Sequence, residues 1–212
     1  MTRFVVATIV ACVYVLPAWS LDLRDCDSPD PGRRIEACTT ILHRGKDKAA
    51  WGGAYNNRAG AFMAKGDYDR ALADYDMAVQ LNPEVAAAWA NRGTLWSRKE
   101  NYDRSIADLT KAIQLDSSPW KSFNNRSNAW KEKGEYTKAK DDLDQAIRRA
   151  PNEPRPYALR AEVWRLLGDL DGAIADLDKA IAMVPPNTPA RQRADGDDFD
   201  IPRRRLALPG RI

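Results

Sequence analysis

The chain has 212 residues, of which 44% are hydrophobic and 30% are charged, a composition that is typical of globular proteins with a packed core. Its 33 basic and 30 acidic residues give a formal net charge of only +3. This balance creates no large field of one sign, so it argues against nucleic acid or an anionic membrane as the main ligand.

The first twenty residues are typical of a secretory signal peptide. Arg3 is followed by an apolar run over residues 4–16, and the small residues Ala18 and Ser20 predict cleavage after Ser20. This run gives roughly 20 Å of helix, short of the ~30 Å hydrocarbon core, so we expect no stable membrane span. The alternative is a lipoprotein signal in which Cys12 is lipidated. Export predicts a periplasmic or secreted protein.

Removal of the signal peptide leaves two cysteines, Cys26 and Cys38. An even number of cysteines in an exported chain predicts a disulfide, worth about 3 kcal/mol of stability for a loop of this size. The alternative is a pair of free thiols. Together with the lone His43 these residues provide too few ligands for a metal, so we expect no metal site.

The segment from residue 52 onwards repeats with a period of 34 residues. Pro83, Pro151 and Pro185 lie on this grid, and Ser117 takes the remaining proline position. The grid divides the segment into four units, 52–85, 86–119, 120–153 and 154–187.

Two aromatic columns recur in every unit, seven residues apart and therefore on one helical face, where we expect the core. Their members are Tyr55, Trp89, Phe123 and Tyr157, followed by Phe62, Trp96, Trp130 and Trp164. Turn residues come next, at Gly66, Glu100, Gly134 and Gly168, and then a column of small residues, Ala71, Ser105, Ala139 and Ala173. This order predicts that each unit is a helical hairpin whose second helix packs closely on the first.

As a set, these columns resemble the tetratricopeptide-repeat (TPR) family, and the resemblance covers residues 34–185. It implies an all-α solenoid of four hairpins over residues 52–185. Extended backwards, the grid places Ala37 and Ile41 in the second helix of a truncated unit, so we expect residues 34–44 to form a half-repeat within an N-terminal cap, residues 21–51. The second unit is the least regular, because it carries Glu100, Ser105 and Ser117.

In the TPR family, the first helices of the hairpins line a concave groove that binds an extended peptide or a partner helix. The resemblance therefore implies an adaptor or scaffold whose partner is a protein or peptide. The family's groove positions fall here on Asn56, Asn57, Asn91, Thr94, Lys121, Asn124, Asn125, Asn128, Lys131 and Arg155, with Arg98, Glu162 and Arg165 beside them. Asn57, Asn91 and Asn125 recur 34 residues apart, and their amides could pair with the main chain of a ligand. The alternative interpretation is that these amides join neighbouring helices.

Two charged columns also recur in all four units: Arg58, Arg92, Arg126 and Arg160, followed sixteen residues later by Asp74, Asp108, Asp142 and Asp176. We expect ion pairs between packed helices, because a guanidinium group binds a carboxylate through two parallel hydrogen bonds. An anion-binding arginine stripe is the functional alternative.

The repeat grid ends after Pro185, and prolines and aspartates predict a disordered tail over residues 186–212. The last predicted helix keeps an apolar face of Ile174, Leu177 and Ile181 without a following hairpin. This face suggests the alternative function, a self-assembling repeat protein that forms a homodimer through its last helix.

The sequence shows no set of nucleophile, base and charge-stabilising groups, and its glycines fall on turns rather than in a phosphate-binding loop. We therefore expect that the protein is not an enzyme, needs no cofactor and binds no nucleic acid.

Overall fold

The structure is a computed structural model that describes residues 23–44 and 49–185. These residues form nine α-helices, one short 3-10 helix and no strand. The elements are η1 (Leu23–Asp27), α1 (Pro31–Arg44), α2 (Ala49–Ala64), α3 (Tyr68–Leu81), α4 (Ala86–Arg98), α5 (Tyr102–Leu115), α6 (Trp120–Glu132), α7 (Tyr136–Arg149), α8 (Pro154–Leu167) and α9 (Leu170–Met183). The predicted signal peptide, Cys12 and the predicted tail lie outside the described residues.

Helices α2 to α9 form four hairpins, as the repeat pattern predicts. Each hairpin turns through a residue with positive φ, which is Gly66, Glu100, Gly134 or Gly168. In three of the hairpins the next residue, Asp67, Asn101 or Asp169, starts the second helix with a side chain that accepts a backbone N–H three residues on. Among the described helices, none is long and apolar enough to cross a membrane.

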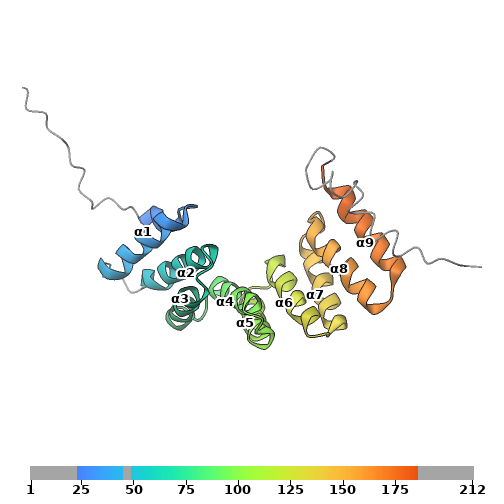
Figure 1. The fold of residues 1–212 in the computed structure, drawn as a ribbon, viewed down its shortest axis with the longest axis horizontal. Helices are drawn as coiled ribbons and strands as arrows, with labels where there is room; N and C mark the ends of the chain where they lie inside the picture. The colour runs from blue at the N-terminus through green and yellow to red at the C-terminus, as the bar shows by residue number, and fades with distance from the viewer. Residues whose placement is uncertain (1–22, 45–48, 186–212) are drawn as a thin grey trace, which may run out of the picture.

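The hairpins stack in chain order into a curved row (Figure 1). Each second helix packs against the first helix of the next hairpin, and α4 also contacts both α2 and α6. Figure 1 shows α1 and α9 rising at the two ends on the same side, with α2 and α4 above α3 and α5 on the inner side of the curve. The contacts of α4 with α2 and α6 continue this inner row of first helices. The all-α solenoid with four hairpins and an N-terminal half-repeat is thus confirmed, and its concave face consists of the first helices.

The core lies along the packed faces of the hairpins. The column of small residues is fully buried, with Ser105 among its members, so the prediction of close helix packing is confirmed. The aromatic columns are only partly core: Phe62, Phe123 and Tyr157 are buried, whereas the other members are half-buried. Cations cover the indole rings of the second column; the Arg104 guanidinium lies 4.6 Å from the centre of Trp96 and the Lys138 ammonium 4.7 Å from that of Trp130.

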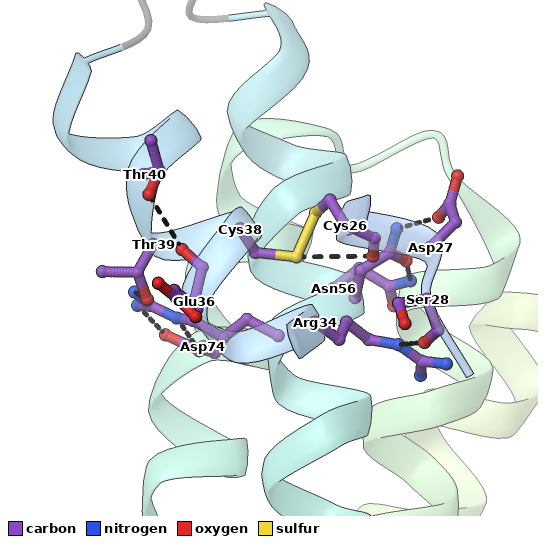
Figure 2. Close-up of a disulfide and its surroundings, with 12 residues drawn as sticks. Cys26, Asp27, Ser28, Arg34, Glu36, Cys38, Thr39, Thr40, Asn56 and Asp74 are labelled. Carbon is purple, nitrogen blue, oxygen red and sulfur yellow. Dashed lines mark hydrogen bonds and ion pairs between the residues drawn. A yellow bond between two sulfur atoms is a disulfide. The ribbon is translucent and has the colours of Figure 1, made fainter. Parts of the chain in front are cut away.

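The N-terminal cap consists of η1 and α1 (Figure 2). On the repeat grid, η1 falls where a complete unit would have its first helix, and sequence analysis missed it because five residues are too few to show a helical period. Helix α1 begins ahead of the expected residue 34, since Asp30 accepts the Arg33 N–H at 2.7 Å and so starts the helix earlier.

The two cysteines of the cap are joined in the structure, with an S–S distance of 2.11 Å and a Cα–Cα distance of 4.8 Å. The bridge ties η1 to α1 and is buried against Ala37 and Ala54, so it also fixes both elements against α2.

Candidate functional site

A groove of about 270 Å³ lies between α4 and α6 on the concave face. Its apolar part is formed by Ala86, Ala87 and Ala90 of α4. Four of the residues predicted from the repeat phase meet in its wall: Asn91, Thr94, Lys121 and Asn125. The groove therefore combines room for a small apolar side chain with amide, hydroxyl and ammonium groups at its edge, and the carboxylate of Asp116 also lines it.

The recurring asparagines also join neighbouring units. Asn125 Nδ2 donates to Thr94 Oγ1 at 3.0 Å, and Asn91 Nδ2 donates to Asn56 Oδ1 at 3.0 Å. Asn57 Nδ2 donates in the same way to Asp27 Oδ1 of η1. The alternative interpretation, in which these amides join helices, is therefore correct for all three.

These structural bonds leave part of the hydrogen-bonding capacity of the groove unused. An amide carries two N–H donors and a carbonyl acceptor. Asn91 and Asn125 each use one donor in the contacts that the structure describes, so a carbonyl oxygen and a second N–H remain at the groove. The two roles predicted for these asparagines are compatible.

Lys121 is a groove cation that is open to a ligand. Its side chain is exposed, and its ammonium lies 5.9 Å from the centre of the Trp120 ring without an ion pair to any described residue. Arg155 of α8 is similarly exposed, and Asn128 is half-buried. Lys121 thus gives the groove a cation whose charge is not neutralised by an ion pair to a described residue, whereas Arg155 lies outside the groove between α4 and α6.

Lys131 differs, because acidic residues already hold it. Its side chain is only 17% exposed, and Nζ lies 3.0 Å from Glu162 Oε1 of α8 and 3.4 Å from Glu132 Oε1. Burial alone would lower the pKa of Lys131, but the hydrogen bond and charge of Glu162 hold this pKa above its ordinary value. The charge of Lys131 is therefore already neutralised, so a ligand carboxylate competes with Glu162 for it.

Asn124 was wrongly predicted as a groove residue. It is 1% exposed, and its Oδ1 has no hydrogen-bond partner among the described residues. Asn56 occupies the same offset in the first unit and accepts a hydrogen bond from Asn91 of the next unit. In the unit that follows Asn124, the offset of Asn91 is occupied by Leu159, whose side chain has no hydrogen-bond donor. The repeat phase alone could not reveal this difference.

The predicted ion pairs between packed helices are confirmed in all four hairpins. Each arginine of the column donates through Nε and Nη2 to both carboxylate oxygens of its aspartate, at 2.6 to 2.8 Å. The carboxylate hydrogen bond raises the pKa of Arg92 above its ordinary value in spite of burial. Since these guanidinium groups are engaged, the anion-binding arginine stripe is wrong.

Sequence analysis missed the third bond of each arginine. Nη1 donates to the preceding element: to Thr39 from Arg58, to Asp76 from Arg92, to Thr110 from Arg126 and to Asp144 from Arg160. The acceptors alternate between threonine and aspartate, so they form no column of one residue type. Arg58 therefore links the first hairpin to the cap, and each of the other three arginines links its own hairpin to the one before it.

Charge is unevenly divided between the two layers of helices. Helices α2 and α4 contain no acidic residue, and α6 and α8 contain one each, Glu132 and Glu162. Every second helix carries two or more aspartates. The concave face therefore offers basic and amide groups, which suit an acidic ligand. No group of three or more metal-binding side chains is found within residues 23–44 and 49–185.

Three models of the tetratricopeptide repeat match the chain, over residues 53–85, 86–119 and 128–188. Among solved structures, a crystal structure of MamA is 19% identical with a TM-score of 0.67, and the match covers 76% of this chain and 92% of that one. MamA of Desulfovibrio magneticus RS-1, from residue 41 to its end, is 16% identical with a TM-score of 0.66 and coverage of 76% and 89%. At these identities the likeness shows a common fold. No curated protein matches the chain.

Proposed function

Because the chain belongs to the tetratricopeptide-repeat family, we propose that it is an interaction adaptor that binds an extended segment of a partner polypeptide in the groove between α4 and α6. The observation that carries this proposal is the meeting of Asn91, Thr94, Lys121 and Asn125 around an alanine-lined hollow. Amide groups there pair with the main chain of a ligand, whatever its side chains are.

The chemistry of the groove favours a particular kind of segment. The hollow of about 270 Å³ accepts a small aliphatic side chain against Ala87 and Ala90. Lys121 stands at its edge and has no ion pair to a described residue, so an acidic side chain of the partner can pair with it without displacing another carboxylate. Asp116 also lines the groove and accepts hydrogen bonds from Ser118, so the acidic side chain of the partner has to lie away from this carboxylate. The proposed ligand is an extended acidic segment with small apolar residues.

We further propose that the adaptor works outside the cytoplasm, in the periplasm or after secretion. The apolar run that follows Arg3 and the pairing of Cys26 with Cys38 support this proposal. The mass of the protein recovered from its native host tests it: a mature chain that begins at Leu21 and has no free thiol is expected, whereas a chain that still starts at Met1 would contradict export.

The binding proposal is tested by a pull-down from periplasmic extract with purified residues 21–212. Replacing all three recurring asparagines would weaken the helix junctions, so a cleaner change is Lys121→Glu, which reverses the charge at an exposed position. Arg148→Glu is the matched control, since Arg148 is an exposed residue on the second helix α7. Both variants must match the wild type in helicity and melting temperature.

A protein retained by the wild type and by Arg148→Glu, but lost with Lys121→Glu, is the expected result and identifies the partner. Mass spectrometry of the eluted proteins provides the readout. Equal retention by all three proteins would move the binding site away from the groove.

A further inference from the structure

Polar contacts between successive hairpins recur at fixed offsets. Comparison of the three junctions, which are the interfaces between successive hairpins, shows at which of them these contacts are missing. At the first junction, between the first and second hairpins, Asn91 donates a hydrogen bond to Asn56, and Lys99 Nζ lies 2.8 Å from Asp69 Oδ1. At the second junction Asn125 bonds to Thr94 and Lys133 pairs with Asp103. Each of these junctions thus has one amide bond on the concave face and one lysine–aspartate pair beside the turns.

The junction between the third and fourth hairpins lacks both contacts. Leu159 stands where the amide donor would be, and the Asn124 Oδ1 that it would serve is buried without a partner. Thr137 stands at the offset where the first two junctions have the aspartate of the lysine–aspartate pair, and Leu167 stands at the offset of its lysine. The side chain of Leu167 is 41% exposed. A buried acceptor without a donor weakens this junction further.

Two kinds of contact hold the fourth hairpin, and both have counterparts at the first junction, where Leu95 packs with Tyr75 and Arg92 pairs with Asp76. Val163 and Leu159 of α8 pack against Leu143 of α7 in an apolar cluster. The polar contacts are ion pairs: Lys131 with Glu162 at 3.0 Å, and Arg160 with Asp144 at 2.6 Å. Asp144 is also bound by Lys140 at 2.7 Å. Each of these charged side chains keeps some contact with solvent, so dissolved ions screen them.

We propose that the fourth hairpin, α8–α9, is a hinged unit that turns about the Leu143–Val163 cluster and is latched by the Lys131–Glu162 and Arg160–Asp144 pairs. Weakening the latch by salt, or by a carboxylate that replaces Glu162 on Lys131, frees the hairpin to move. The functional meaning of the hinge rests on the proposed groove, because Arg155 and Glu162 of α8 move with it and Lys131 becomes available to the ligand.

Hydrogen exchange of the mature chain, followed by mass spectrometry at about 0.05 M and about 0.5 M NaCl, tests the hinge without any partner. We expect the amides of α8 and α9 to lose several-fold more protection with salt than those of α4 and α5. Salt also screens the Arg92–Asp76 and Lys99–Asp69 pairs at the first junction, but the Asn91–Asn56 bond remains there. Equal losses in both hairpins would overturn the proposal.

Two variants distinguish hydrogen exchange that the ion pairs control from the higher exchange expected of any terminal helix. Glu162→Gln removes one latch pair, and we expect it to raise exchange in α8 and α9 at low salt while α4 and α5 stay unchanged. Asp69→Asn removes the equivalent exposed pair at the first junction and is the control, because an amide bond remains there. If Glu162→Gln has no effect on exchange, α8–α9 is not latched.

Restoring the missing contacts provides the reciprocal test. Leu159→Asn supplies a donor for Asn124, and Thr137→Asp with Leu167→Lys rebuilds the pair beside the turns. We expect the combined variant to make exchange in α8 and α9 less sensitive to salt; unchanged sensitivity would overturn the hinge. These measurements need no partner, so a failed pull-down leaves the hinge standing, and a failed hinge leaves the groove between α4 and α6 untouched.

Discussion

Glu100 is in the left-handed backbone region, with φ of 59°, at the turn offset where the other three hairpins have glycine. A residue with a side chain is strained in this region of the folded backbone, whereas glycine is not. Glycine also raises the entropy of the unfolded chain, which offsets part of this gain in stability. We expect Glu100→Gly to raise the free energy of unfolding by up to about 1 kcal/mol in urea denaturation. The reverse change, Gly134→Glu, should lower it, and neutrality of both would contradict the assignment of strain to this turn.

The arginine column links hairpins, so its loss should be costly. The Arg92 side chain is 17% exposed and Asp108 only 8%, and Arg92→Met leaves this carboxylate buried without its partner. We expect a loss of about 3 kcal/mol in the free energy of unfolding. Arg98→Met is the matched control on the same helix, because Arg98 is exposed. A loss no greater than that of the control would show that the ion pair is not stabilising.

Ser105 is the member of the small column whose hydroxyl is buried without a hydrogen-bond partner among the described residues. Ser105→Ala removes this oxygen, so we expect the free energy of unfolding to rise by about 1 kcal/mol. Ser127 is equally buried, but its hydroxyl donates to Asn124 O at 2.7 Å. Ser127→Ala should therefore lower stability, and thermal melting of the two variants should show shifts of opposite sign.

At the residue scale, the sequence predicts what recurs within a unit and misses what depends on the next unit. The Arg92–Asp108 pair could be predicted because both columns lie in the same hairpin in every repeat. The burial of Asn124 could not, because the residue at the same offset in the first unit, Asn56, is only partly buried. Asn91 and Asn125 were predicted for the groove, and only the packed helices show that they also join units.

At the scale of elements, helices with a full period could be predicted from the repeat, whereas η1 needed the structure. Helix α1 was expected from Ala37 and Ile41, which continue the columns backwards. Element η1 carries no period, and its place on α1 and α2 depends on the cysteine bridge and on the bond between Asn57 and Asp27. The position of η1 therefore depends on tertiary contacts, which is why pattern analysis finds the cap but not this element.

The bridge should accordingly stabilise the cap more than the rest of the array. We expect Cys26→Ser with Cys38→Ser to cost about 3 kcal/mol in the loop-entropy model and to raise hydrogen exchange first in α1. Wild-type protein treated with a dithiol reductant is the control and should show the same loss. Two thiols that react with a maleimide in the untreated mature protein would contradict the pairing.

At the scale of the whole molecule, each hairpin contacts mainly its neighbours, so stability is close to a sum of hairpins and junctions. Residues 21–153, which lack α8, α9 and the tail, keep the cap, three hairpins and the complete groove between α4 and α6. We expect this shortened chain to fold with the helicity per residue of the full chain and to retain the partner from the pull-down. Circular dichroism and retention on the same resin provide the measurements.

The shortened chain also tests the alternative function. Ile174 and Leu177 of α9 are only partly buried, so a homodimer built on this helix would give the full chain twice the monomer mass in light scattering, and residues 21–153 the mass of a monomer. An adaptor that works through the groove predicts equal binding by both chains. Loss of binding together with loss of the dimer would assign the function to α9, because the groove residues are the same in the two proteins.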